Sequence, residues 1–373
     1  KLDRRAKEIP GGTIVRRKDG DLTGVLKDEA MNPVYSVIPD PPLSRRDSAL
    51  ARAMRHAASL GVVGVSSVST SWADIAALEW ARARGTLTLR VSNYIPLAAW
   101  RSMADSLKAR GPGDEWIRTA GVKGFVDGSL GSTTALMFAP YRDAPGTRGL
   151  FVTSEDSLRR WIGAADSAGL QVAVHAIGDR ANALLLDIYD SVAKAHGPRD
   201  RRFRIEHAQH LRAADIPRFA ALGVIPSMQP YHEADDGRWA AKRIGPELIK
   251  GTYAFRSLLD SGARLAFGSD WTVAPLDPLA GIKAAVTRQT LDGKYPEGWV
   301  PEQKISVEEA LRAYTAANGY AVFADGTRGV LKPGFRADLV VLDRDITRVP
   351  PASIDQAKVV VTVVGGRIVY RKG

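Results

Sequence analysis

The sequence contains no cysteine among its 373 residues. This absence excludes disulfides, thiolate zinc sites and a cysteine nucleophile, but it does not fix the compartment. No run of eighteen apolar residues occurs, so we expect no transmembrane helix. The chain opens on Lys1, without an initiator Met or a signal-peptide pattern. We interpret this start as set by processing or truncation, which leaves cytoplasmic and exported locations open.

Acidic residues are in deficit, because 52 Lys and Arg face 41 Asp and Glu and give a formal net charge of +11. Such an excess can indicate a nucleic-acid partner. Here the basic residues are mostly scattered Arg, and their densest cluster spans only 199–204. We therefore predict a solvated, Arg-rich surface, with neither nucleic acid nor membrane as partner. Homo-oligomerisation stays open.

Short β-branched runs alternate with longer amphipathic stretches, a rhythm that indicates an α/β fold built of βα units around a parallel sheet. The predicted strands span 62–68, 87–92, 122–126, 171–175, 203–207, 224–229 and 264–270. The predicted helices span 44–60, 71–84, 154–168, 179–195, 213–222, 246–261 and 306–321. A closed TIM (β/α)₈ barrel needs eight such units, so the sequence is one unit short of it.

The two ends of the chain have a different character. Residues 1–43 are rich in turn formers such as Pro10-Gly11-Gly12, and we expect a loop-rich segment there. The barrel is predicted over 44–328. Residues 329–373 contain a strand-like run and a hairpin pattern with a Gly365-Gly366 turn, which predicts a small antiparallel element, part of a β-sandwich.

Metal-competent side chains stand on four of the predicted strands. His175, His207 and Asp270 each end a strand, and Lys123 lies within another. Since the carboxyl ends of parallel strands meet at one mouth, two imidazoles and a carboxylate there favour Zn²⁺ or a similar divalent ion. Singly, each residue has a plainer interpretation: a structural His, a helix N-cap, or a Lys that reaches solvent. Jointly, four such residues in one barrel favour a shared site.

Four sequence segments around these residues carry motifs that are typical of one protein family. Residues 123–129, 174–179, 204–209 and 267–271 read KGFVDGS, VHAIGD, RIEHAQ and FGSDW. With these motifs the sequence resembles the amidohydrolase superfamily, and in particular its amidohydrolase 3 branch of YtcJ-like and N-substituted formamide deformylase-like proteins. The resemblance runs through nearly the whole chain.

The resemblance implies a role for each residue. Lys123 would be carboxylated and bridge two ions, and His175 and His207 would bind the second ion. Asp270 would be a metal ligand and also the catalytic group that moves a proton from water to the leaving nitrogen. The implied activity is a metal-dependent hydrolysis of carbon–nitrogen bonds in small non-peptide amides or formamides, by attack of metal-activated water.

One element of the family pattern is missing. The first barrel strand of the family ends in a His-x-His pair, but none of the six histidines here lie two residues apart. We therefore expect a barrel that lacks its first strand, with one or two ions bound. Two alternatives stay open: a catalytically inactive or truncated chain, and an esterase or lactonase of the same fold.

Further candidates surround this predicted site. Asp127 and Ser129 follow the Lys123 strand, and we expect both to contact substrate, as we do His232 and Trp271. Simple packing is the alternative for Trp271. His210 could orient a metal ligand from behind or lie on the surface.

Overall fold

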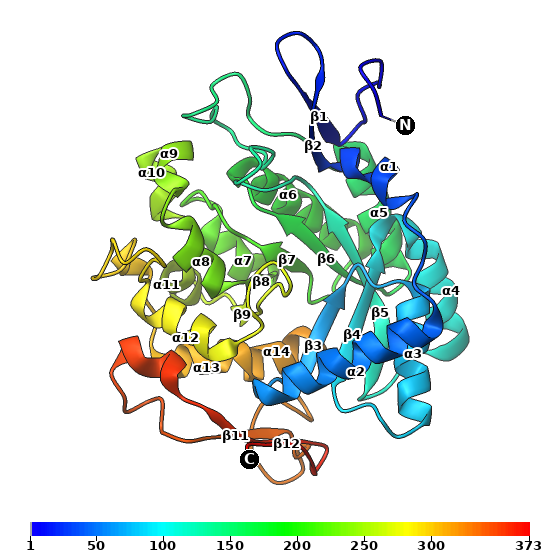
Figure 1. Ribbon diagram of the computed structural model, residues 1–373, viewed down its shortest axis with the longest axis vertical. Helices are drawn as coiled ribbons and strands as arrows, with labels where there is room; N and C mark the ends of the chain where they lie inside the picture. The colour runs from blue at the N-terminus through cyan, green and yellow to red at the C-terminus, as the bar shows by residue number, and fades with distance from the viewer. Residues whose placement is uncertain (1) are drawn as a thin grey trace.

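The computed structural model describes residues 2–373, and its centre is a parallel sheet curled into an incomplete barrel (Figure 1). The strand order follows the chain from β3 to β9, so that β3 and β9 form the two edges within the described residues. Its strands are β3 (Gly64–Val68), β4 (Arg90–Pro96), β5 (Ile117–Phe125), β6 (Gln171–Ala176), β7 (Arg204–His207), β8 (Ile225–Met228) and β9 (Ala266–Phe267). All seven predicted strands are confirmed with shifted ends, and among the described residues the eighth strand of a closed barrel is absent.

Helices cover the outer face of the curled sheet (Figure 1). The helices of the described residues, including α1 beside the N-terminal hairpin and α8 at the cavity, are α1 (Asn32–Tyr35), α2 (Leu43–Ser59), α3 (Trp72–Ala83), α4 (Trp100–Arg110), α5 (Glu155–Ser167), α6 (Asp179–His196), α7 (Ile216–Leu222), α8 (Pro230–Asp236), α9 (Ala240–Arg243), α10 (Pro246–Lys250), α11 (Phe255–Asp260), α12 (Pro278–Thr287), α13 (Val307–Tyr314) and α14 (Ala316–Ala321). Short 3₁₀ turns are η1 (Glu29–Met31), η2 (Leu97–Ala99), η3 (Pro301–Gln303) and η4 (Pro351–Gln356). Within residues 2–373, no helix combines the length and the apolarity needed to cross a membrane.

Two predicted helices are wrong in their continuity. The helix predicted over 246–261 is divided into α10 and α11 at Gly251, where an added Cβ would lie 1.9 Å from the Leu211 carbonyl oxygen. This close backbone approach requires a glycine, which ends the helix. The helix predicted over 306–321 is divided at Thr315, whose dihedrals of −122° and −85° are not helical. Its predicted start is confirmed, because Ser306 and Glu309 form a capping box.

The N-terminal segment contains strands where a loop was expected. β1 (Gly12–Arg16) and β2 (Leu22–Asp28) form an antiparallel hairpin, since both contain β-branched residues, which favour strands. The Lys27 ammonium donates hydrogen bonds to Ser132 and Thr133 in the loop after β5. The hairpin therefore lies near the carboxyl ends of the barrel strands.

The C-terminal segment is a single three-stranded antiparallel sheet and, within the described residues, has no second layer of a sandwich. It consists of β10 (Leu339–Leu342), β11 (Val359–Val364) and β12 (Arg367–Arg371), and the predicted Gly-Gly turn joins the last two. Asp338, just before β10, forms an ion pair of 2.7 Å with Arg90 at the start of β4. This sheet therefore packs against the amino ends of the barrel strands, opposite the hairpin (Figure 1).

Strand alternation decides which side chains enter the barrel. On β6, Val172 and Val174 are fully buried in the apolar layer under the helices. Gln171 and His175 have the opposite parity and share the other face, where the Gln171 amide oxygen accepts a hydrogen bond from Tyr94 of β4. The period of two along β6 thus directs His175 inward, as the sequence pattern predicts.

Candidate metal centre

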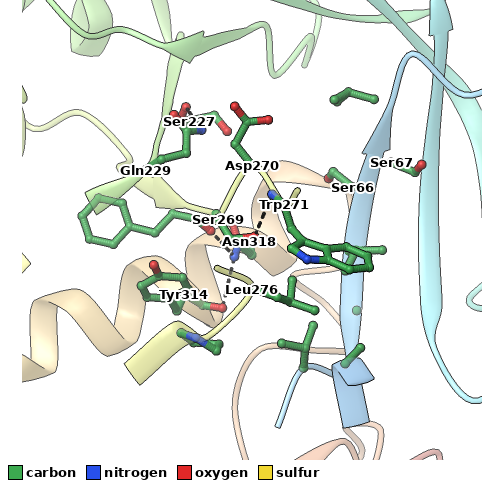
Figure 2. Close-up of a pocket in the computed structure, with 18 of the residues that line it drawn as sticks. Ser66, Ser67, Ser227, Gln229, Ser269, Asp270, Trp271, Leu276, Tyr314 and Asn318 are labelled. Carbon is green, nitrogen blue, oxygen red and sulfur yellow. Dashed lines mark hydrogen bonds between the residues drawn. The ribbon is translucent and has the colours of Figure 1, made fainter. Parts of the chain in front are cut away.

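A cavity of about 1760 Å³ runs along the inside of the curled sheet and is large enough for a small-molecule substrate. The lining includes seven of the nine site residues predicted from the sequence. They are Lys123, Ser129, His175, His207, His232, Asp270 and Trp271. Figure 2 shows Asp270 and Trp271 beside Gln229 and Ser227 in this cavity.

The ring of His207 is held by one neighbour in a defined orientation. Its Nδ1 donates to the Gln229 amide oxygen at 2.7 Å, and the Gln229 amide nitrogen donates to the Ser227 carbonyl oxygen. Burial lowers the pKa of His207, so the ring is neutral and its Nε2 keeps a free lone pair. The backbone φ of 75° at His207 turns the chain out of the strand pattern. Glu206 and His207 can therefore both face inward although they are adjacent.

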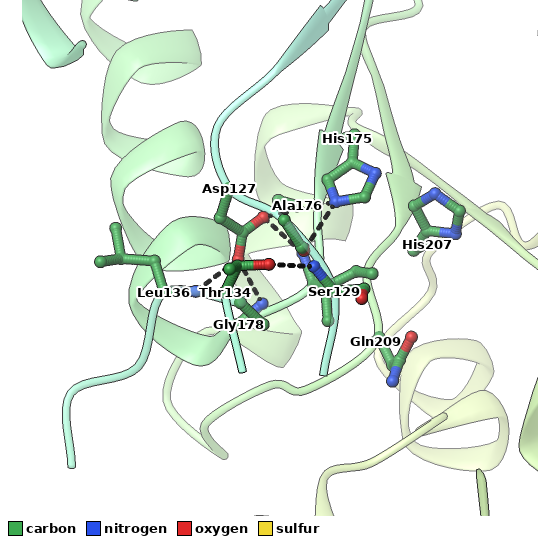
Figure 3. A network of polar contacts seen from close by, with 12 residues as sticks. Asp127, Ser129, Thr134, Leu136, His175, Ala176, Gly178, His207 and Gln209 are labelled. Atoms are coloured by element: carbon green, nitrogen blue, oxygen red, sulfur yellow. Dashed lines mark hydrogen bonds and ion pairs between the residues drawn. The ribbon is translucent and has the colours of Figure 1, made fainter. Parts of the chain in front are cut away.

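His175 lies beside His207, with ring centroids 4.6 Å apart (Figure 3). Its Nε2 donates to the Gly128 carbonyl oxygen at 3.0 Å. Burial lowers the pKa of His175 well below its ordinary value, and the nearby His207 and Lys123 lower it further. The ring is therefore neutral, with the lone pair on Nδ1. A neutral imidazole fixed through its other nitrogen is the form in which His binds a metal.

A third imidazole and a carboxylate complete the cluster. One ligand atom each from His207, His232 and Asp270 lies within 4.8 Å of the other two. His232 Nε2 is 4.0 Å from Asp270 Oδ2, and it is buried without a hydrogen-bond partner in the part of the chain that the structure describes. An unsatisfied buried nitrogen beside a second imidazole and a carboxylate fits a divalent ion such as Zn²⁺.

Lys123 lines the same cavity and is buried, with 3% of its surface exposed. Its ammonium donates to the Gly124 carbonyl oxygen and lies 3.5 Å from the centre of the Phe125 ring. Burial lowers the pKa of Lys123 to about 7, although Glu206 and Asp270 oppose the shift. The amine is therefore partly neutral near physiological pH.

Sequence reasoning missed the buried ion pair that fills the barrel beside Lys123. Arg204 and Glu206 pair at 2.7 Å, two residues apart on β7, and Glu206 also accepts a hydrogen bond from Ser227. Two opposite charges at i and i+2 of a short strand were the available signal, because that spacing puts both on the inner face.

The structure places Asp127 away from the cavity, which corrects the expected contact with substrate. Asp127 is fully buried, and its carboxylate accepts hydrogen bonds from the backbone N–H groups of Leu136, Ile177 and Gly178 (Figure 3). Both oxygens are used in joining the loops after β5 and β6. Ser129 does line the cavity.

His210 and Trp271 take different positions from each other. His210 is fully buried, which excludes the surface alternative, and its ring contacts Thr252 and Gln209. The ring nitrogens of His210 therefore contact none of the candidate metal ligands directly. Trp271 lines the cavity with 45% of its surface exposed and packs against His56 of α2, at 5.6 Å between ring centroids.

Comparison with known proteins agrees with the fold described above. The chain belongs to the amidohydrolase family, whose model matches residues 1–370. The expected resemblance to the amidohydrolase 3 branch is confirmed, because the chain is 32% identical to the putative amidohydrolase YtcJ of Bacillus subtilis over 378 residues. That match covers 100% of this chain and 70% of YtcJ.

Two further relatives fit the same family. The protein LONG AFTER FAR-RED 3 of Arabidopsis thaliana is 40% identical over 372 residues, which cover 96% of this chain and 63% of that protein. The crystal structure of an uncharacterized metal-dependent hydrolase from Pyrococcus horikoshii has a TM-score of 0.77 and 32% identity, and covers 91% of this chain and 68% of that one. The chain thus spans 63% of the length of LONG AFTER FAR-RED 3 and 70% of the length of YtcJ.

Proposed function

We propose that this chain forms the catalytic barrel of a metal-dependent hydrolase that cleaves carbon–nitrogen bonds in small non-peptide amides or formamides. One observation carries the proposal: His207, His232 and Asp270 converge in the cavity, and a buried nitrogen of His232 has no hydrogen-bond partner among the described residues. His175 supports it, since its neutral ring lies beside His207.

A divalent ion bound there would lower the pKa of a water molecule and polarise a carbonyl group. His207 and His232 would hold it through their free nitrogens, and His175 would add the nitrogen that its hydrogen bond to Gly128 leaves free. Asp270 would accept a proton from the attacking water and return it to the leaving nitrogen. The Asp270 side chain is 31% exposed, so the carboxylate can reach a substrate in the cavity.

Lys123 would contribute a carboxylated side chain. Only a neutral amine forms a bond to CO₂, with loss of a proton, and burial brings the pKa of Lys123 to about 7. The resulting carbamate is an anionic oxygen ligand, a hard donor of the kind that suits divalent ions. An uncharged or anionic Lys123 also removes a buried ammonium from beside two imidazoles.

Two substitutions test the proposal in the full-length protein. Asp270→Asn should abolish turnover of N-substituted formamides and leave bound metal, measured by mass spectrometry, nearly unchanged. His175→Ala should remove metal. Full turnover by Asp270→Asn, or full metal occupancy in His175→Ala, contradicts the assigned roles.

A substrate panel addresses the other activities of this fold. Formamides, acyl amino acids and lactones should be compared at equal concentration, with the exposed Asp105→Asn variant on α4 as a matched control for Asp270→Asn. Turnover confined to lactones favours a lactonase, and absence of turnover together with absence of metal favours an inactive chain.

A further inference from the structure

Gln209 stands at the wall of the cavity, two residues after His207, with only 3% of its surface exposed. Its amide nitrogen contacts two buried groups. It lies 2.8 Å from Asp236 Oδ2 and 3.0 Å from His210 Nε2. Figure 3 shows the amide oxygen on the side of Ser129 and His207, with the nitrogen on the opposite side.

The surrounding hydrogen bonds fix which end of the amide faces inward. The Thr252 hydroxyl donates to the Leu248 carbonyl oxygen, so it must accept the proton of His210 Nδ1. His210 Nε2 is then an acceptor, and burial lowers the pKa of His210 to about 3, which keeps the ring neutral. An acceptor at 3.0 Å requires the NH₂ group of Gln209.

Asp236 also requires the NH₂ group of Gln209 as its donor. Its Oδ2 accepts hydrogen bonds from the Tyr253 hydroxyl at 2.7 Å and from Gln209 at 2.8 Å. Both protons of the Gln209 amide are thus used by acceptors of the protein itself, His210 Nε2 and Asp236 Oδ2. A flipped amide would put its oxygen against a carboxylate oxygen and a ring nitrogen. The Gln209 oxygen and His210 Nε2 would then have no donor, and Asp236 Oδ2 would keep only the Tyr253 hydroxyl.

We propose that Gln209 is a specificity-determining residue that presents a fixed amide oxygen to an N–H group of the substrate. The inference rests on the proposed function and extends it: the preferred substrates are secondary amides or N-monosubstituted formamides, which carry one N–H donor. His210 is a positioning residue, since it orients the Gln209 amide and does not line the cavity. Asp236 holds the same amide nitrogen from a position in the cavity lining.

The physical reason is the cost of an unpaired acceptor. A buried carbonyl oxygen that loses contact with water and finds no donor is penalised, so an N-methylated analogue binds less well than its N–H counterpart. The fixed orientation adds to selectivity, because Gln209 cannot turn its NH₂ group toward the analogue without breaking two hydrogen bonds. We expect a preference of about tenfold.

The test compares two probes, N-benzylformamide and N-benzyl-N-methylformamide, by calorimetric binding to the metal-loaded full-length protein. The wild type should bind the N–H probe about tenfold more tightly. Gln209→Met, of similar length but without the acceptor, should bind both probes equally and keep the affinity for the N-methyl probe. An unchanged ratio in Gln209→Met, a wild type without preference, or a wild type that binds neither probe overturns the inference.

A second variant separates orientation from folding. His210→Phe removes one of the two acceptors that hold the Gln209 amide protons. It should partly reduce the preference for the N–H probe, with metal content and binding of the N-methyl probe unchanged. An equal loss of affinity for both probes would show that His210 only supports the fold. Turnover is measured in parallel. A binding preference without turnover contradicts the proposed hydrolysis and leaves Gln209 as a recognition residue. Turnover without a binding preference supports the proposed hydrolysis and overturns the role of Gln209.

Discussion

The carboxylate of Asp127 gives the sharpest prediction about how the mouth of the barrel is built. Oδ2 accepts hydrogen bonds from Leu136 N at 2.7 Å and Gly178 N at 2.8 Å, and Oδ1 accepts one from Ile177 N at 3.0 Å. In Asp127→Asn the amide oxygen can keep the two bonds from Leu136 and Gly178. Its NH₂ group then faces the Ile177 N–H donor, and a buried donor without an acceptor costs about 1–3 kcal/mol.

An opposing contribution reduces the expected loss. Burial raises the pKa of Asp127 to about 7, so the neutral Asn is spared part of the cost of burying a charge. We therefore expect Asp127→Asn to lower the free energy of unfolding by about 1–3 kcal/mol in urea titrations at pH 7.5. The exposed Asp105→Asn variant on α4 should change it by less than about 0.5 kcal/mol.

The result also decides between two roles for Asp127. A loss of stability below about 1 kcal/mol together with a raised KM would refute the structural reasoning and restore the expected contact with substrate.

The remaining predictions concern the inner face of the barrel. Gln229→Leu should weaken metal binding about 10–100-fold in chelator competition with the fold intact, because it removes the acceptor that orients His207; an unchanged affinity would contradict this. Glu206→Leu should cost about 3–5 kcal/mol in urea unfolding by leaving Arg204 unpaired, and adding Arg204→Met should recover much of it; a more costly double variant would contradict this. Burial lowers the pKa of His210 to about 3, so only the unfolded chain gains its proton between about pH 6.5 and 3, and stability falls by about 1.4 kcal/mol per unit as pH drops through this range. His210→Asn should show a correspondingly shallower slope in acid titrations monitored by circular dichroism, and equal slopes would contradict the assignment.

The sheet could be predicted because its signals are local. Each buried parallel strand is a short β-branched run, and alternation along β6 is enough to direct His175 inward. β9 is shorter than expected, since the positive φ of 56° at Asp270 shows that the chain has already turned out of the strand. The helix breaks at Gly251 and Thr315 depend on backbone approach and on dihedrals that side-chain periodicity does not record.

The site was predictable in its members and less so in its contacts. Strand ends supply His175 and His207, but His232 enters from α8, whose Pro230 at the first helical position was an available signal. The burial of Asp127 could not be predicted, because it depends on the folding of its own loop, which supplies the Leu136 donor, against the loop after β6, which supplies Ile177 and Gly178.

The most direct measurement of the central claim is anomalous X-ray scattering at the zinc edge from crystals of the metal-loaded full-length protein. The account predicts a peak within about 2.0–2.3 Å of a nitrogen of His207 and near Asp270, lost in crystals of His207→Ala. A cavity without a peak, or a peak bound only at other residues, would contradict it.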